Sequence, residues 1–172
     1  WLKAQGLFPY VEKYYPAFKK IFSECLKLKK ETVMVVFDEG YPTRRCSAIL
    51  AGCYILAMKR LGITFQLVKQ SPKFAGEQAD DITVDKMFNY PSGNILILCL
   101  SGKLGSMKHL GKSFRKYISD NSHRFVSTSG LRDLETKYFA KLVASIDVDY
   151  EEIKRRGKEL KRKIDYANEM HI

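Results

Sequence analysis

Short, strongly apolar runs alternate with longer segments of helical periodicity, and this alternation constrains the fold more than any other feature. The run Asn94–Leu100 is the most apolar strand-type segment of the chain, and Thr32–Phe37 is a β-branched run of the same type. Two further short runs, 64–69 and 123–127, mix apolar with polar residues. Strands that alternate with helices over long connections are typical of a parallel sheet covered by helices.

The strand order follows from how apolar each run is. Strands buried on both faces are continuously apolar, whereas edge strands are mixed. Runs 32–37 and 94–100 are therefore expected at the centre, with 64–69 and 123–127 at the edges. We predict an α/β domain of the Rossmann or flavodoxin-like kind, with three layers, a four-stranded parallel sheet in the order 2-1-3-4, and helices on both faces.

Helical periodicity predicts six helices, over 9–30, 43–61, 82–88, 108–119, 133–145 and 150–168. Thr43 is the expected N-cap of the second helix, and Gly62 is expected to end it. Asp149 with Glu152 forms a capping-box pattern at the start of the last helix. Segment 48–58 has almost no polar residue, so we expect its far side to be covered, either by the N-terminal helix, which is the favoured alternative, or by a partner.

The last predicted helix has one narrow apolar seam. Its apolar or small residues recur at spacings of three and four, at Tyr150, Ile153, Gly157, Leu160, Ile164 and Ala167. Such a seam packs against one neighbour and leaves the rest of the helix in water. We expect the seam to dock onto the sheet or the first helix of its own domain.

The chain has 172 residues, 45% of them hydrophobic, which fits one domain over 1–172 with a helix within 1–31 and another over 149–169. Its longest apolar run, 48–58, is shorter than the roughly 20 residues of a membrane span, so no membrane partner is expected. The four cysteines form no C-x-x-C motif and fall in apolar stretches. They predict free thiols in a reducing compartment, hence a cytoplasmic protein.

The formal net charge of +11 suggests a nucleic-acid binder, but its distribution argues otherwise. The densest basic block, 154–163, follows the acids Asp149, Glu151 and Glu152. That order complements a helix dipole. No aromatic residues that could stack on bases lie between the basic residues. We therefore expect a solvated helix face and no specific nucleic-acid partner.

The predicted topology places a ligand crevice at the switch point between the first and third strands. Its lips are the residues that follow these strands, namely Asp38, Glu39, Gly40, Ser101, Gly102, Gly105 and Ser106. Backbone N–H groups of Gly105 and Ser106 at a helix start can hold a small anion. Asp38 and Glu39 can hold a metal or act as acid and base. The alternative, that Asp38 only turns its loop, is favoured because no second acidic or histidine cluster is predicted nearby.

No self-contained catalytic centre, metal site or cofactor site is predicted. The glycine-rich loop 102–113 places five residues between Gly105 and Gly111, whereas a phosphate loop requires four. No dinucleotide fingerprint follows the first strand. A catalytic triad would have to use His109 or His123, but no nucleophile motif supports one, and no histidine pairing suggests zinc.

The C-terminal third nevertheless resembles a known family. Ser122–Gly130 is followed by a predicted helix, and then Val148–Lys154 reads VDYEEIK before a basic amphipathic helix. This arrangement resembles the first domain of thermophilic-type leucyl aminopeptidases, the aminopeptidase T group. The opening TVMVVFDEG and the Ala/Gly-rich helix after it also fit, so the resemblance spans roughly 30–165. Thr128-Ser129 departs from the family's Met-Pro pair, and loop 101–113 lacks its Thr-His-Thr run.

The resemblance implies a two-domain metallopeptidase of which this chain is the non-catalytic N-terminal domain. A pair of divalent metals (Zn, Co or Mg) would lie in a C-terminal domain beyond Ile172, and no catalytic residue would fall in this chain. The full-length protein would bind a peptide substrate and could form a homodimer. The missing initiator Met suits a fragment. The alternative is a free-standing flavodoxin-like module that binds a small anion or a nucleotide.

Overall fold

The computed structural model, which describes residues 1–107 and 113–166, contains one four-stranded sheet. All strand pairs are parallel, and the order is β2-β1-β3-β4, as predicted. In the central register, Val33 lies beside Phe65 on one side and Ile95 on the other. The strands are β1 (Val33–Phe37), β2 (Phe65–Lys69), β3 (Ile95–Cys99) and β4 (Arg124–Thr128).

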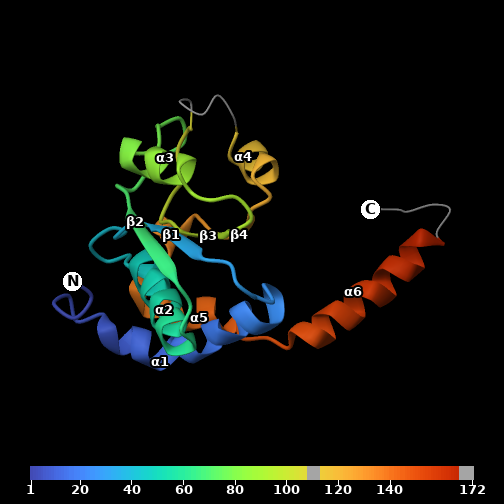
Figure 1. The fold of residues 1–172 in the computed structure, drawn as a ribbon. Coiled ribbons are helices and arrows are strands. Elements are labelled where there is room, and N and C mark those ends of the chain that lie inside the picture. The colour runs from blue at the N-terminus through green and yellow to red at the C-terminus, as the bar shows by residue number, and fades with distance from the viewer. Residues whose placement is uncertain (108–112, 167–172) are drawn as a thin grey trace.

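Helices cover both faces of the sheet, which confirms the three-layer α/β fold (Figure 1). Alternate side chains of the central strands enter two separate cores, with Val35 and Ile97 in one and Met34 and Leu96 in the other. The first core is closed by α1 (Phe8–Lys20), α2 (Cys46–Leu61) and α5 (Phe139–Ala144). The second is closed by α3 (Asp81–Phe88) and α4 (Phe114–Asp120).

Strand burial follows the apolar character of each run. Every residue of β3 is buried, and so is every residue of β1 except Phe37. In β4, partly buried and exposed residues alternate, and Val68 is the one buried residue of β2. The prediction of central and edge strands is therefore confirmed.

The apolar helix α2 lies under α1, as predicted. A Cβ placed on Gly52 would lie 2.7 Å from a Val11 methyl carbon, so this glycine lets the two helices approach closely. Further along, the rings of Phe18 and Tyr54 pack edge to face with centroids 4.8 Å apart. Segment 48–58 is thus covered by the chain itself.

The predicted helix ends are partly correct. Gly62 ends α2 with φ +68°, and the Asp149 carboxylate accepts a hydrogen bond from the Glu152 N–H at 3.0 Å. Thr43 is not the N-cap of α2, because that helix begins at Cys46 with no side-chain cap. The Thr43 carbonyl instead accepts hydrogen bonds from the N–H and the hydroxyl of Thr136, which ties two loops together.

Three predicted helices differ in extent. Helix α1 is followed by a π-helical turn, Ile21–Cys25, and the helical run ends before the predicted limit at 30. The predicted helix 133–145 is a 3-10 turn, Thr136–Tyr138, followed by the short α5. Helix α4 begins at Phe114 with Ser113 as its N-cap, and the predicted part over 108–112 lies outside the described residues.

The last helix, α6 (Tyr150–Asp165), projects away from the domain as an arm (Figure 1). None of its residues is buried, so the prediction that its seam docks onto its own domain is wrong. Both faces of the sheet are already covered by other helices, which leaves α6 without a layer to join. At its base, Lys20 pairs with Asp147 at 2.6 Å, and the Tyr150 hydroxyl donates to the Ile146 carbonyl.

None of the helices within 1–107 and 113–166 is both long and apolar enough to cross a membrane.

Candidate functional site

Asp38 is the first residue after β1, and its side chain is completely buried. One carboxylate oxygen accepts hydrogen bonds from the Ser47 hydroxyl at 2.7 Å and the Gly40 N–H at 2.9 Å. The other accepts from the N–H and the hydroxyl of Ser101, at 2.8 and 2.9 Å. Asp38 turns its own loop through the bond from Gly40, but it does not only do so, because the same carboxylate joins the ends of β1 and β3 to the first turn of α2.

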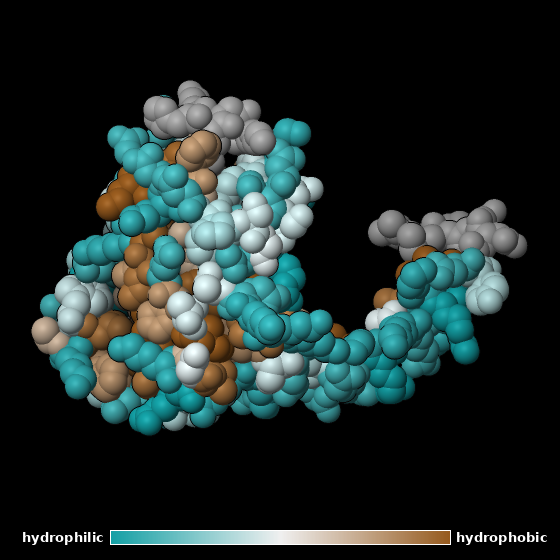
Figure 2. Space-filling view, viewed as in Figure 1, coloured by the Kyte–Doolittle hydropathy of each residue, from teal (hydrophilic) through white to brown (hydrophobic). Residues whose placement is uncertain are grey.

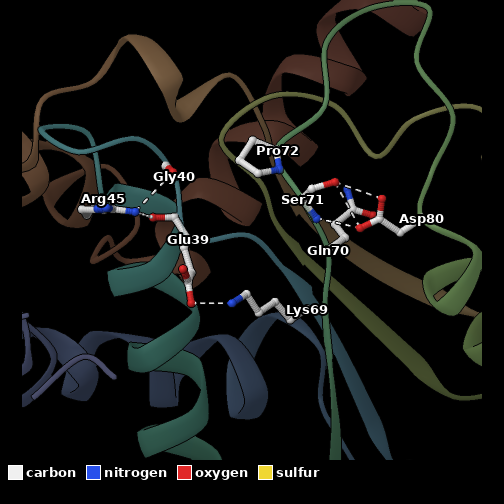
Figure 3. Close-up of a pocket in the computed structure, with 8 residues that line it drawn as sticks. All are labelled: Glu39, Gly40, Arg45, Lys69, Gln70, Ser71, Pro72 and Asp80. Carbon is white, nitrogen blue, oxygen red and sulfur yellow. Dashed lines mark hydrogen bonds and ion pairs between the residues drawn. The ribbon is translucent and has the colours of Figure 1, made fainter. Parts of the chain in front are cut away.

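The carboxylates of Glu39 and Asp38 have different partners, so the two acids do not share one site. The Glu39 carboxylate pairs with Lys69 Nζ at 2.6 Å, across the ends of β1 and β2 (Figure 3). Arg45 donates to the backbone carbonyls of Glu39 and Gly40. Gly40 has φ +67°, and a Cβ there would lie 2.4 Å from the Arg44 carbonyl oxygen, so only glycine fits this turn.

The loop after β3 is covered by a segment of the same chain, residues 73–79. The Lys103 N–H donates to the Lys73 carbonyl at 3.0 Å, and the Ser106 N–H donates to the Glu77 carbonyl at 2.8 Å. Cβ atoms on Gly102 and Gly105 would lie 2.0 and 2.4 Å from backbone atoms of that segment. These glycines therefore allow two backbones to cross, and the Ser106 N–H holds a carbonyl rather than an anion.

A cavity of about 350 Å³ lies one strand away from the predicted crevice, at the ends of β1 and β2 (Figure 3). It shares Glu39 and Gly40 with the prediction and adds residues that the sequence did not single out. The cavity is lined by Glu39, Gly40, Arg45, Lys69, Gln70, Ser71, Pro72 and Asp80.

The two acidic side chains of this cavity, Glu39 and Asp80, are each held in an ion pair. Asp80 accepts hydrogen bonds from the N–H and the hydroxyl of Ser71 and pairs with Lys73 Nζ at 2.5 Å. Partial burial acts to raise the pKa of Asp80, but the bonds from Lys73 and Ser71 outweigh it, and the pKa is lowered. Gln70 is buried, donates its amide N–H to the Leu104 carbonyl, and leaves its amide oxygen without a partner.

Comparison of the chain with protein-family models, with curated proteins and with solved structures found no match.

His123 lies at the opposite edge of the sheet, immediately before β4. Its Nε2 is 3.2 Å from the Tyr117 hydroxyl oxygen, and its Nδ1 is 3.3 Å from the backbone nitrogen of Asn94. Burial lowers the pKa of His123, although a hydrogen bond with Asn94 opposes that shift. This histidine is a buried structural group, far along the strands from Asp38. His109, the other histidine considered for a triad, lies outside the described residues.

The buried thiols are poorly suited to nucleophilic chemistry. Burial raises the pKa of Cys46 to about 11, and it also raises the pKa of Cys53 and of Cys99. All four cysteines are free, and Cys25 alone is exposed. Among the described residues, no three His, Cys, Asp or Glu side chains come together in a way that could hold a metal ion.

Proposed function

We propose that this chain is the non-catalytic N-terminal domain of a metal-dependent aminopeptidase-like protein. In this account a C-terminal domain removes residues from the N-terminus of a peptide, and the present domain supports it. The proposal rests on the resemblance of 30–165 to that family and on the behaviour of α6. The VDYEEIK segment, which is the most specific part of the resemblance, forms the capped first turn of α6.

The exposed apolar side of α6 is the observation that carries this proposal. Ile153, Leu160 and Ile164 are 53%, 58% and 49% exposed, on a helix that none of the domain's layers covers. Figure 2 shows their surroundings as a largely hydrophilic arm with apolar patches along one side. Removing apolar surface from water stabilises by about 25 cal/mol per Å². A helix that exposes a regular apolar seam is therefore better explained as a docking element than as a free arm.

The metal pair of the proposed enzyme, zinc, cobalt or magnesium, would be bound outside this chain. The Asp38 carboxylate already accepts hydrogen bonds from Ser101 and Ser47, and the Glu39 carboxylate is paired with Lys69. The role of the present domain is to position a second domain and to form one wall of the substrate cleft. A peptide substrate would then meet the ends of β1 and β2 rather than a reactive group of this chain.

The test compares this chain with the protein encoded by its extended reading frame. Both are assayed for hydrolysis of a leucyl-anilide and for bound metal by elemental analysis. We expect the extended protein to hydrolyse the substrate with two divalent metals bound, and the chain alone to do neither. A stop codon directly after Ile172, or an extended protein with neither metal nor activity, would contradict the proposal.

A second function, binding of a small anion or nucleotide, is favoured by one observation. The cavity at the ends of β1 and β2 is lined by the basic side chains of Arg45 and Lys69, which can bind a phosphate, and by the unpartnered amide oxygen of Gln70, which can accept a hydrogen bond from a nucleotide base. Its volume is at the lower end of the range for ligand sites. Calorimetric titration with phosphate and with ATP tests it, using Lys69→Ala and, as an exposed control, Lys59→Ala. Micromolar binding that only Lys69→Ala removes would favour this function over the first.

A further inference from the structure

The apolar seam of α6 repeats with the spacing of a coiled coil. Its described members, Tyr150, Ile153, Gly157, Leu160 and Ile164, follow one another at intervals of three, four, three and four residues. These are successive a and d positions of a heptad. We refer to these five residues as the α6 seam. A seam of two apolar residues per heptad fits the matching seam of another helix, whereas a helix that lies on a sheet needs a wider apolar face.

Within Tyr150–Asp165, the residues that border the α6 seam are all basic, although the N-cap Asp149 also borders Tyr150. In the same heptad, the flanking e and g positions are Lys154, Arg156, Lys161 and Lys163. The acidic residues of α6 lie one row further from the seam and pair with these bases along the helix. The pairs include Arg156 with Glu152 at 2.7 Å and Lys161 with Asp165 at 2.6 Å. A partner helix would therefore meet positive charge on both sides of the seam.

This charge pattern disfavours a second copy of the chain as the partner. When two helices pair through their a and d residues, the e and g positions of one face those of the other, in parallel and in antiparallel pairs alike. Two α6 helices would oppose Lys and Arg with Lys and Arg along the whole contact. A homodimer of this protein would consequently have to use another surface.

We infer that the α6 seam docks onto a helix of another domain or protein whose own apolar seam is bordered by Asp and Glu. The inference extends the proposed function. It rests on that proposal in one respect, because both take α6 to be a docking element. Opposite charges at the flanks then fix the orientation of the partner and select it against basic helices.

Gly157 agrees with a close helix–helix contact. It lies in the middle of the α6 seam, and a Cβ at this position would meet no atom of residues 1–107 and 113–166 within 4 Å. Nothing inside the domain therefore requires glycine here, although glycine is a poor helix former. At an a position, the missing side chain lets the backbone of a partner helix come near.

The experiment uses two synthetic helical peptides of about three heptads with Leu and Ile at a and d. One carries Glu at every e and g position, and the other carries Lys. Each is labelled and titrated with the whole chain, and binding is followed by fluorescence anisotropy at low and high salt. We expect the Glu peptide to bind at least tenfold more tightly than the Lys peptide, with a preference that shrinks as salt rises.

Two matched variants show whether the flanking charges cause the preference. Lys161→Glu with Lys163→Glu changes both borders of the α6 seam, and we expect the preference for the Glu peptide to disappear. Lys158→Glu with Arg162→Glu makes the same change in net charge on the far side of the helix and should leave the preference intact. Circular dichroism checks that both variants keep their helix content.

Three results would overturn the inference. These are equal binding of the two peptides, binding of neither, or dimerisation of the chain through α6 that Leu160→Glu abolishes in analytical ultracentrifugation. Each of them leaves the peptidase test of the extended protein unaffected. A failed charge preference is therefore distinguishable from a failed assignment to the aminopeptidase-like proteins.

Discussion

The backbone N–H and the hydroxyl of Ser101 both donate to one carboxylate oxygen of Asp38, at 2.8 and 2.9 Å. The two residues follow β1 and β3, so the contact closes the sheet at its topological switch point. In many parallel sheets this is where a ligand binds. Here the position is filled by the protein's own polar groups, and the cavity lies one strand away.

Asp38→Ala should destabilise the fold strongly. The substitution leaves the N–H and hydroxyl of Ser101, the hydroxyl of Ser47 and the N–H of Gly40 without their acceptor. Since buried polar groups that lose a partner cost about 1–3 kcal/mol, we expect the free energy of unfolding to fall by about 3 kcal/mol in urea. Glu39→Ala removes an exposed ion pair and should cost less than about 1 kcal/mol. Equal losses from the two variants would contradict the assigned role of Asp38.

Of the four thiols, Cys25 should react alone in the native protein. It is exposed, although burial of part of its side chain raises its pKa, and the other three thiols are buried with raised pKa values. Titration with a chromogenic disulfide at pH 8 should show one thiol reacting in the native state and four after addition of guanidinium. Cys25→Ser should remove the native reaction. A second thiol that reacts as quickly would show that the core around α2 opens readily.

The free energy of unfolding should decrease as the pH drops below about 6.5, and His123 should cause part of this decrease. Its pKa is lowered in the folded protein, so the unfolded chain takes up a proton first as the pH falls. The stabilisation is complete above the pKa of the unfolded histidine and is lost as pH falls through the folded pKa. Urea unfolding at pH 7.5 and at pH 5.5 gives the free energy of unfolding at each pH. We expect the difference between these two values to be smaller for His123→Gln than for the original chain. An unchanged difference would mean that other groups carry this pH dependence.

Gly157→Ala should make α6 more helical but a poorer docking element. Alanine is favoured over glycine by about 1 kcal/mol within a helix, and the new methyl group would contact no atom in the described part of the chain. Circular dichroism should show more helix, and the Glu-flanked peptide should bind less tightly because the methyl group holds the two backbones apart. A gain in helix content together with tighter peptide binding would argue against a close contact at this residue.

The sheet was predictable because its strands differ in composition. Unbroken apolar runs mark β1 and β3 as central, and mixed runs mark β2 and β4 as edges, so the order followed from burial on one or two faces. Helix α2 was likewise expected to be covered, because a helix apolar on all sides cannot face water.

The candidate site was less predictable, because it depends on a polar segment without periodicity. Nothing between Gln70 and Gly93 shows that residues 73–79 cross the loop after β3. Gly102 and Gly105 were the available signal, but close glycines fit an anion loop and a backbone crossing equally well. The neighbour of α6 was unpredictable for a similar reason, because apolar spacing indicates that a helix has a neighbour but does not indicate which one.

Native-state hydrogen exchange of α6 tests the central claim, that this helix lacks its partner in the isolated chain. We expect the amides of Tyr150–Asp165 to exchange much faster than those of α2, because unpacked helices open locally with little cost. Their exchange should slow on addition of the Glu-flanked peptide and not on addition of the Lys-flanked one. Protection of α6 equal to that of α2 in the chain alone would show that the helix is already docked on its own domain, and would contradict the account.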